Sequence, residues 1–593
     1  MAEYQAPLAQ MRFTLEHLAD LREVTALPAF EAATPDLVDA VLEEAAKFAS
    51  EVLSPLNALG DRVGVSVEND AVVVPESFSK AYAKFSDAGW TAVAGNPEFG
   101  GQGLPKTVAA ACEEMWSGAN MAFALCPELS QGAMLAVERH GSEALRGTYL
   151  EPMIAGRWTA SMCLTEPQAG SELAALTTRA VRHKDHYLIT GRKIFITWGD
   201  HPMAENIAHL VLARAPDAPA GSRGLSLFLV PKYRLRKDGS PGERNDVRPV
   251  SVEHKLGIHA SPTCVLAFGD QGGAEGYLIG RENEGLAAMF TMMNYMRLGV
   301  GLQVVGVAER SCQQSAAYAR ERVQGAAPGQ KGRVPIIRHP DVRRMLLTMR
   351  SLTQAARALC YYTASCLDRA AHGADAAAVE GWQGRADLLT PIAKAWCTEI
   401  AQEVTSLGIQ VHGGMGYVEE TGVAQLFRDT RIASIYEGTN GIQAIDLVGR
   451  KLLRDGGATV SAMVSEMRSV DPMLANAGDE LAGVRQALSR GLDEVVLCST
   501  HLLSGAKRDP DLPGAGAMHY LMLMGTVIGG WQLARGALAA LAAPPGSADV
   551  GFLRVQIVLA RFYAEQILPR TLSHGAAVRA GSATVMALSA EQF

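Results

Sequence analysis

A change of pattern divides this sequence: helical patterning gives way to β-type patterning at Arg157 and returns after Gly285. Between these points the pattern predicts short strands, at 158–164, 187–190, 193–197, 209–213 and 225–230. Gly191-Arg192 predicts a turn between two of them, and residues 237–249, rich in Pro, Gly and charge, predict an exposed loop. A β block between two helical stretches restricts the chain to a mixed α and β architecture.

Helical patterning covers the rest of the chain. Residues 36–48 repeat apolar side chains at helical spacing, and the face expected to be buried consists of Leu37, Val38, Val41, Leu42 and Ala45. After the β block, four stretches are long enough to build a bundle, at 284–320, 341–371, 388–407 and 440–454. Gly456-Gly457 marks a boundary, and residues 458–593 supply further helices.

The length of 593 residues exceeds what one hydrophobic core supports, so several domains are expected. We predict an α+β fold that is mostly helical. Its four parts are an N-terminal helical domain at 1–156, a barrel-like middle β-domain at 157–280, a C-terminal four-helix bundle at 281–455 and an extra helical domain at 456–593.

Composition excludes several classes of protein. Hydrophobic residues make up 48% and charged residues 20%, typical of a soluble globular protein, and the net charge of -8 argues against a nucleic-acid-binding surface. Nine cysteines occur singly, so we expect neither a disulfide framework nor a metal site. The longest apolar run, 521–531, is about half of the ~20 residues that span a bilayer. Since no signal peptide or peroxisomal address is evident, we predict a cytoplasmic protein without a membrane span.

Two segments of the β block are candidates for ligand binding. Cys163–Glu172, with the sequence CLTEPQAGSE, follows a strand and exposes backbone N–H groups and hydroxyls, which suit a phosphate or a planar ring; it could also be an ordinary loop. In Lys193–Gly199, Phe195 and Thr197 share one face of a strand and could flank a heteroaromatic ring. The alternative for Phe195 is a place in the core.

Two segments of the later helical region are candidates as well. In Gln410–Tyr417, paired glycines permit close approach of the backbone to a ligand, although Gly413 could simply end a helix. In the second segment, Thr439 or Asn440 is a good N-cap, and Glu437 stands just before it in an apolar run. Glu437 could be an exposed loop carboxylate. The occurrence of all four segments in this order favours a shared function.

The four segments together resemble the acyl-CoA dehydrogenase family over roughly residues 40–452. The resemblance lies in the patterns TEPxAGS, KxFIT, QxxGGxGY and YEGT(N)GIQ. The tail that follows, and the insertion-like residues 325–335, resemble a longer subgroup with an extra C-terminal helical domain. That subgroup includes long-chain and 3-methylthiopropanoyl-CoA dehydrogenases.

The resemblance implies an FAD-dependent enzyme that oxidises an acyl-CoA thioester to the trans-2-enoyl-CoA, with Glu437 as the catalytic base. It places FAD between the β-domain and the C-terminal bundle. It also implies electron transfer to electron-transferring flavoprotein and at least a homodimer, because the FAD site is shared between subunits.

The resemblance also implies site residues, at the positions of this sequence that match the family's contacts. The positions that match FAD contacts in the subunit itself are Met162, Thr165, Ser171, Phe195, Thr197 and Thr439. Those that match FAD contacts across the dimer are Arg322, Gln410 and Gly414. The positions that match substrate contacts are Ser171, Asn294, Arg297 and Gly438. The sequence departs from the family pattern at 323–325. It departs again at Gly441, a position at which many members have a glutamine.

Other functions remain open at this point. An acyl-CoA oxidase would use oxygen directly, and a catalytically silent relative would act as an interaction protein. A nitroalkane-oxidase-like enzyme would use an aspartate base, so Glu437 counts against it. A four-helix metal protein is disfavoured, because His412 has no ligand partner at helical spacing.

Overall fold

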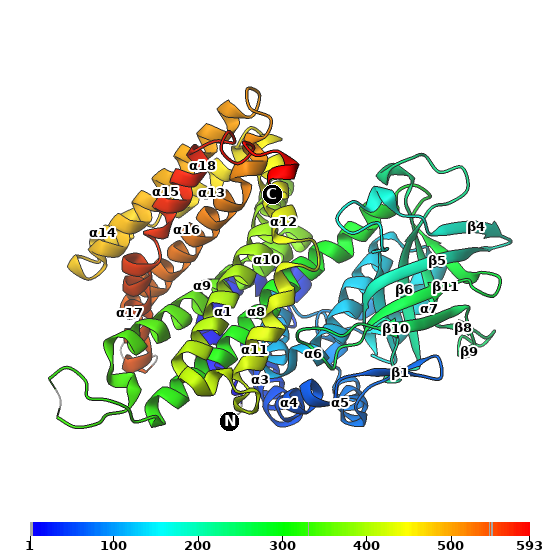
Figure 1. The fold of residues 1–593 in the computed structure, drawn as a ribbon, viewed down its shortest axis with the longest axis horizontal. Helices are drawn as coiled ribbons and strands as arrows, with labels where there is room; N and C mark the ends of the chain where they lie inside the picture. Colours follow the sequence, from blue (N-terminus) through cyan, green and yellow to red (C-terminus); the bar gives the residue numbers. More distant parts are fainter. Residues whose placement is uncertain (1–3, 330, 545, 547–548) are drawn as a thin grey trace. The chain divides into compact units, whose positions relative to one another are not determined.

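The structure is a computed structural model in which residues 4–329, 331–544, 546 and 549–593 are described (Figure 1). The chain forms two compact units. Unit 1 comprises Met1–Ala46, Pro105–Glu114 and Val300–Phe593, and unit 2 comprises Lys47–Leu104 and Met115–Gly299. Each unit is described by itself.

Unit 2 contains the β block as one curled sheet of eight strands. Its strands are β3 (Trp158–Cys163), β4 (Arg179–His183), β5 (His186–Thr197), β6 (Asn206–Ala213), β7 (Ser226–Pro231), β10 (Val247–Val252), β11 (Thr263–Phe268) and β12 (Ala274–Ile279). The order is β10-β11-β5-β12-β7-β6-β3, with β4 also paired to β5, and only β3 and β6 run parallel. The predicted middle β-domain is therefore confirmed as a fold.

Two details of the β prediction are wrong. Gly191-Arg192 is not a turn, because β5 continues through it and pairs Gly191 with Phe268 and Arg192 with Ala267. Residues 237–249 are not one exposed loop, since β9 (Pro241–Arg244) pairs with β8 (Tyr233–Leu235) and β10 begins at Val247. A small ladder of β1 (Ser66–Glu68) and β2 (Ala71–Val73) also belongs to unit 2.

Unit 2 also contains helices. They are α4 (Ser54–Val63), α5 (Glu76–Asp87), α6 (Lys106–His140) from Met115 onward, α7 (Glu143–Ile154) and α8 (Gly285–Glu321) up to Gly299. The core joins apolar side chains of α6, α7 and α8 to those of the sheet, including Leu129, Met153, Met292 and Leu210. This core supports one face of β3, the strand that leads into the first candidate segment.

Unit 1 is helical. Its elements include α1 (Leu8–His17), α2 (Leu21–Thr25), α3 (Pro35–Phe48), α9 (Pro340–His372), α10 (Ala376–His412), α11 (Val423–Thr430), α12 (Asn440–Asp446), α13 (Ala458–Arg468), α14 (Asp471–Asn476), α15 (Asp479–Gly505), α16 (Leu512–Ala542), α17 (Val550–Gln566) and α18 (Arg570–Arg579), together with the later part of α8. The helical spacing in α3 predicted burial correctly for Val38, Leu42 and Ala45. Leu37, at the edge of that face, is exposed.

Helix α16 joins the last part of unit 1 to the long helices, and Figure 1 shows it beside α15, α17 and α18. The close approach to α10 requires Gly525, because a Cβ there would lie 2.2 Å from the ring of Trp396. The Trp396 Nε1 then donates to Thr526 Oγ1 over 3.3 Å. Across the described ranges of the chain, no helix combines the length and the apolar character needed to cross a membrane.

Candidate active site

The loop that follows β3 is fixed by Glu166, a buried residue of the first candidate segment. Its carboxylate accepts backbone N–H groups from Thr177 (2.8 Å) and Thr178 (3.0 Å) and both threonine hydroxyls (2.7 and 2.5 Å). It also accepts Lys193 Nζ at 2.9 Å. Because every one of these partners belongs to unit 2, the contacts that hold this loop come from its own unit.

Lys193 links the first candidate segment to the second. Its side chain is fully buried in β5, and its Nζ also donates to the carbonyl of Leu164 over 2.9 Å. Burial lowers the pKa of Lys193, while the adjacent Glu166 carboxylate opposes this shift. Burial raises the pKa of Glu166, but Lys193 and the hydrogen bonds from Thr178 outweigh it and bring that pKa down to about 2. Both members of the pair are therefore ionised, and each charge is balanced by the other.

Phe195 is turned out of the sheet by a β-bulge. The register between β5 and β11 shifts so that Ile194 and Phe195 together face the single residue Val265. Phe195 adopts a left-handed backbone, with φ 59°, and its side chain is 58% exposed. The alternative that Phe195 belongs to the core is wrong. A bulge of this kind changes the direction in which a side chain points.

The first two segments lie side by side. The backbone N–H of Ile194 donates to the carbonyl of Thr165 over 2.9 Å, which places Thr165 next to the bulge. Met162 is half-buried against the core of unit 2. Thr197 is half-buried and Ser171 exposed.

The candidate substrate residues of α8 contact each other. Arg297 Nη1 donates to Asn294 Oδ1 over 3.1 Å, and the guanidinium lies 5.8 Å from the centre of the Phe290 ring. Arg297 is buried, with 5% exposed, whereas Asn294 is exposed. Asn294 and Phe290 thus help to position the buried guanidinium of Arg297.

In unit 1, Glu437 occupies a bend between the 3₁₀ turn η10 (Arg431–Ser434) and α12. Its backbone is left-handed, with φ 57°, and Gly438 follows with φ 86°. Gln443 Nε2 donates to the carbonyls of both residues, over 3.3 and 3.4 Å. Tyr436, just before the bend, donates its hydroxyl to Gln303 Oε1 of α8. Glu437 is half-buried, so the alternative that it is an exposed loop carboxylate does not hold.

Residues on the far side of the bend fix it to α10. Thr439 is the N-cap of α12, with its Oγ1 accepting Ile442 N over 3.3 Å. The buried Asn440 accepts Lys394 Nζ at 2.9 Å and donates to Thr398 Oγ1 at 2.9 Å and to Glu399 Oε1 at 2.7 Å, three partners on α10. Anchors on both sides hold the strained backbone of Glu437, as is common at functional sites.

The Gln410–Tyr417 segment forms the end of α10 and the 3₁₀ turn η8 (Gly413–Tyr417). Gly416 is required by packing, because a Cβ there would lie 2.3 Å from the carbonyl oxygen of Ile409. A Cβ on Gly414 would meet nothing within 4 Å. Gln410 and Gly414 are exposed, and Tyr417 is 88% exposed. Gly413 ends the helix with φ 61°, as the alternative interpretation expected.

Arg322 is exposed directly after α8. The residues that follow it depart from the family pattern and form a hairpin-like loop. Gln324 N donates to Val334 O, Val334 N to Gly325 O and Ile336 N to Arg322 O, over 2.9, 2.9 and 2.7 Å. The loop thus begins and ends beside Arg322.

Sequence reasoning missed the residues that hold these segments in place. Glu166, Lys193 and Asn440 each lie inside a candidate segment, but the sequence assigned a role to neither Glu166 nor Lys193. Lys193 offered a signal, because a lysine inside an apolar strand needs a buried partner. Asn440 was considered only as an N-cap. Among the described residues, no cluster of three or more His, Cys, Asp or Glu side chains could hold a metal ion.

Comparison with known proteins gives matches along most of the chain. Residues 36–157, 161–271 and 283–453 match family profiles described as the N-terminal, middle and C-terminal domains of acyl-CoA dehydrogenase. Residues 458–589 match a profile described as "Acetyl-CoA dehydrogenase C-terminal like".

Individual relatives extend over the full length. The 3-methylmercaptopropionyl-CoA dehydrogenase of Ruegeria pomeroyi is 47% identical over 575 residues, 95% of this chain and 96% of that protein. The broad-specificity linear acyl-CoA dehydrogenase FadE5 of Mycobacterium tuberculosis is 33% identical, with 96% of each chain covered. The crystal structure of Caenorhabditis elegans ACDH-11 in complex with C11-CoA has a TM-score of 0.77 at 20% identity, covering 96% of this chain and 93% of that one. At that identity the likeness shows the fold.

Proposed function

The chain belongs to the acyl-CoA dehydrogenase family, and from this membership we propose that it oxidises a saturated acyl-CoA thioester to the trans-2-enoyl-CoA with FAD. The observation that carries the proposal is the position of Glu437. Its half-buried carboxylate projects from a left-handed bend that Tyr436, Gln443 and Asn440 hold from both sides.

Glu437 acts as the general base that removes the α-proton of the thioester. The α-proton is weakly acidic, so a base in a water-poor position contributes roughly 10²–10⁴-fold. The negative charge that develops on the thioester oxygen needs preorganised donors, and the backbone N–H of Glu437 is one candidate. Gly438 beside it lines the thioester position without a side chain.

The flavin residues in unit 2 fit a planar, phosphate-bearing cofactor. The bulge presents the exposed ring of Phe195, and the Glu166–Lys193 pair fixes Thr165 next to it. We assign FAD contacts to Met162, Thr165, Ser171, Phe195 and Thr197. Bound FAD supplies the oxidant that accepts the β-hydrogen as hydride.

Residues of unit 1 are also assigned to FAD. Thr439 is assigned to the flavin of its own subunit. Arg322, Gln410 and Gly414 are assigned to the FAD of a partner subunit, so the active enzyme is at least a homodimer. The open space at Gly414 and the exposed guanidinium of Arg322 suit an adenosine diphosphate group.

Asn294 and Arg297 are assigned to coenzyme A, with Ser171 as a further contact. Arg297 is buried against Phe290 and points its guanidinium at Asn294. For the acyl group, the 47% identity to a 3-methylmercaptopropionyl-CoA dehydrogenase favours a short thioether acyl chain. Electron-transferring flavoprotein is the proposed acceptor, and the cytoplasm the proposed location.

An anaerobic titration of the purified protein with acyl-CoAs tests the proposal. We expect 3-methylmercaptopropionyl-CoA to bleach the oxidised flavin bands more readily than butyryl-CoA or a long-chain acyl-CoA. Glu437→Gln should keep its flavin and lose nearly all bleaching. Bleaching by Glu437→Gln at the wild-type rate would refute the base assignment. Fast reoxidation by air alone, with peroxide as product, would show an acyl-CoA oxidase instead.

A further inference from the structure

A cavity of about 290 Å³ lies in unit 1, and none of its lining residues is assigned to FAD or acyl-CoA, although Arg320 lies two positions before Arg322. Its walls come from four helices or their flanks: Pro7 and Gln10 at α1, Glu309, Cys312, Gln313, Ala316 and Arg320 of α8, Arg350, Gln354 and Arg357 of α9, and Leu559 of α17. The α8 residues are spaced so that they form one helical face. The volume suits a small ligand rather than a nucleotide.

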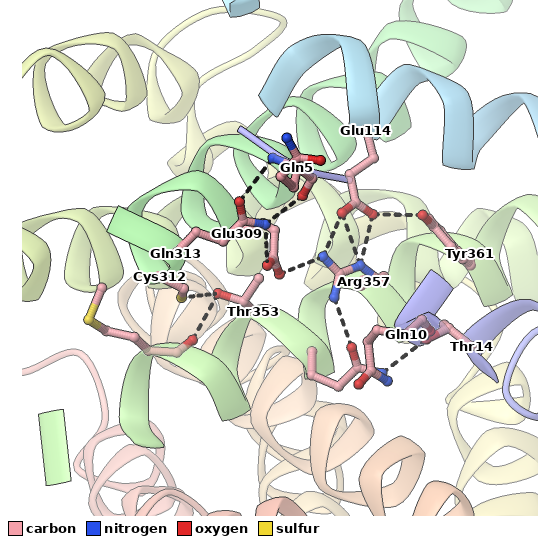
Figure 2. A network of polar contacts seen from close by, with 12 residues as sticks. Gln5, Gln10, Thr14, Glu114, Glu309, Cys312, Gln313, Thr353, Arg357 and Tyr361 are labelled. Carbon is pink, nitrogen blue, oxygen red and sulfur yellow. Dashed lines mark hydrogen bonds and ion pairs between the residues drawn. The ribbon is translucent and has the colours of Figure 1, made fainter. Parts of the chain in front are cut away.

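The inner wall of the cavity is a saturated polar network (Figure 2). Arg357, buried at its centre, donates to both carboxylate oxygens of Glu114, at 2.6 to 3.0 Å, and to Glu309 Oε2 at 2.9 Å. Tyr361 donates to the same Glu114 at 2.7 Å. Two carboxylates share the single charge of Arg357, so none of that charge is left for a ligand.

The amide side chains of the wall are also engaged. Gln313 exchanges hydrogen bonds with the backbone of Gln5, at 2.7 and 3.1 Å, and donates to Glu309 at 2.9 Å. Gln354 accepts from Arg357 at 2.9 Å and donates to Thr14 at 3.0 Å. Gln10 is paired with Gln556 through both amide atoms, at 2.9 and 3.2 Å.

Two arginines at the rim are different. Arg320 and Arg350 are exposed, line the cavity from two helices, and form no ion pair or side-chain hydrogen bond with any residue in the described part of the chain. The carboxylate that lines the cavity, Glu309, is already shared by Arg357 and Gln313. Two guanidinium groups on one small hollow, neither of them paired with a carboxylate of the described residues, favour a bound anion.

We propose that this cavity binds a small oxyanion, a phosphate or carboxylate group, through Arg320 and Arg350. Guanidinium groups match the planar geometry of such oxyanions and bind them with paired hydrogen bonds. Because none of the cavity residues is assigned to FAD or acyl-CoA, the result of the test stands whether or not the proposed function holds.

The test is calorimetric titration of the full-length protein with inorganic phosphate and, separately, with malonate, at an ionic strength kept constant with sodium chloride. We expect saturable binding of at least one of these anions, and the comparison identifies phosphate or carboxylate as the preferred group. Arg320→Gln and Arg350→Gln should each weaken binding by about tenfold or more, because each removes a charged hydrogen-bond donor.

Arg343→Gln is the matched control, since Arg343 is an exposed arginine of the same helix α9 outside the cavity. It should leave the affinity unchanged. Absence of saturable binding by both anions would overturn the proposal. So would equal affinity in wild type and the Arg320→Gln/Arg350→Gln double variant with unchanged helical circular dichroism.

Discussion

Lys193 and Glu166 form an ion pair with Nζ and Oε1 2.9 Å apart and side chains 0% and 2% exposed. Glu166 belongs to the loop after β3 and Lys193 to β5, so the pair joins two segments that the sequence presents separately. The residues proposed to contact FAD stand around it: Thr165 precedes Glu166, and Phe195 follows Lys193 by two positions. The pair positions these residues without being part of the proposed chemistry.

Glu166→Ala should therefore destabilise the protein strongly. Removal of one member of a buried pair leaves the other charge without compensation, at a cost of about 3–5 kcal/mol. Thermal unfolding should shift down by several degrees, and the purified variant should lose flavin. Glu172→Ala, at an exposed glutamate six residues later, is the control and should unfold like wild type. Equal stability of the two variants would contradict the structural role of the pair.

The same pair predicts a pH dependence. The pKa of Glu166 falls from its ordinary value of 4.5 to about 2 in the folded protein. Because the folded pKa is the lower one, the ionised carboxylate adds stability that is fully present above about pH 4.5 and is lost as the pH falls toward 2. Urea unfolding of wild type and Glu166→Gln across this range should show their difference shrinking with acidity. A difference in stability that stays constant over this pH range would argue against a stabilising, ionised Glu166.

Glu437 adopts a backbone conformation that suits glycine better than glutamate. A left-handed residue with a Cβ costs roughly 1–2 kcal/mol, and the φ of Glu437 is 57°. Glu437→Gly should thus be more stable than Glu437→Ala by about 1 kcal/mol, although both lack the proposed base. Thermal unfolding of the two variants measures this directly. If the alanine variant is the more stable, the left-handed bend is not maintained in solution.

Asn440 should matter for catalysis through the position of Glu437. Asn440→Ala removes the hydrogen bonds to Lys394, Thr398 and Glu399 that fix the bend to α10. We expect kcat to fall by about tenfold or more while KM changes less, because a misplaced base weakens the chemical step rather than binding. Gly441→Ala is a neighbouring control, since its Cβ would meet only Thr439 Oγ1, at 3.8 Å. A similar kcat for the two variants would rule out this role.

The turn η8 contains two glycines with different surroundings: packing requires Gly416, whereas Gly414 faces open space. Gly416→Ala would place a Cβ 2.3 Å from the Ile409 carbonyl and should lower the unfolding temperature. Gly414→Ala meets nothing within 4 Å and should leave the unfolding temperature of the flavin-free protein unchanged. If Gly414 contacts FAD as proposed, the same variant should bind FAD more weakly in a fluorescence titration. Wild-type FAD affinity in Gly414→Ala would argue against that contact.

Regular elements were predictable because their periodicity is local. The spacing of Val38, Leu42 and Ala45 gave the buried face of α3, and short apolar runs located β6 and β7. The error at Gly191-Arg192 arose because a glycine in a long strand resembles a turn in sequence, while its pairing with Phe268 on β11 is a long-range contact.

The candidate site was predictable only in part. Motif patterns identified the segments around Phe195 and Glu437, but they carried no information about backbone conformation. The bulge that exposes Phe195 depends on the register against Val265, and the bend at Glu437 depends on partners such as Lys394 in α10. Contacts of this kind connect residues far apart in the chain, where local pattern has no bearing.

The discontinuity of unit 1 has a consequence for how the protein is made. Thr14 of α1 accepts a hydrogen bond from Gln354 of α9, a partner 340 positions later in the chain. During synthesis, residues 4–46 therefore leave the ribosome long before the helices that α1 packs against exist, and all of unit 2 is translated in the interval. Contacts of such long separation form slowly, and apolar surface that awaits them is prone to aggregation. Within unit 1, the segment that contains α1 therefore waits longest for its packing partners during synthesis.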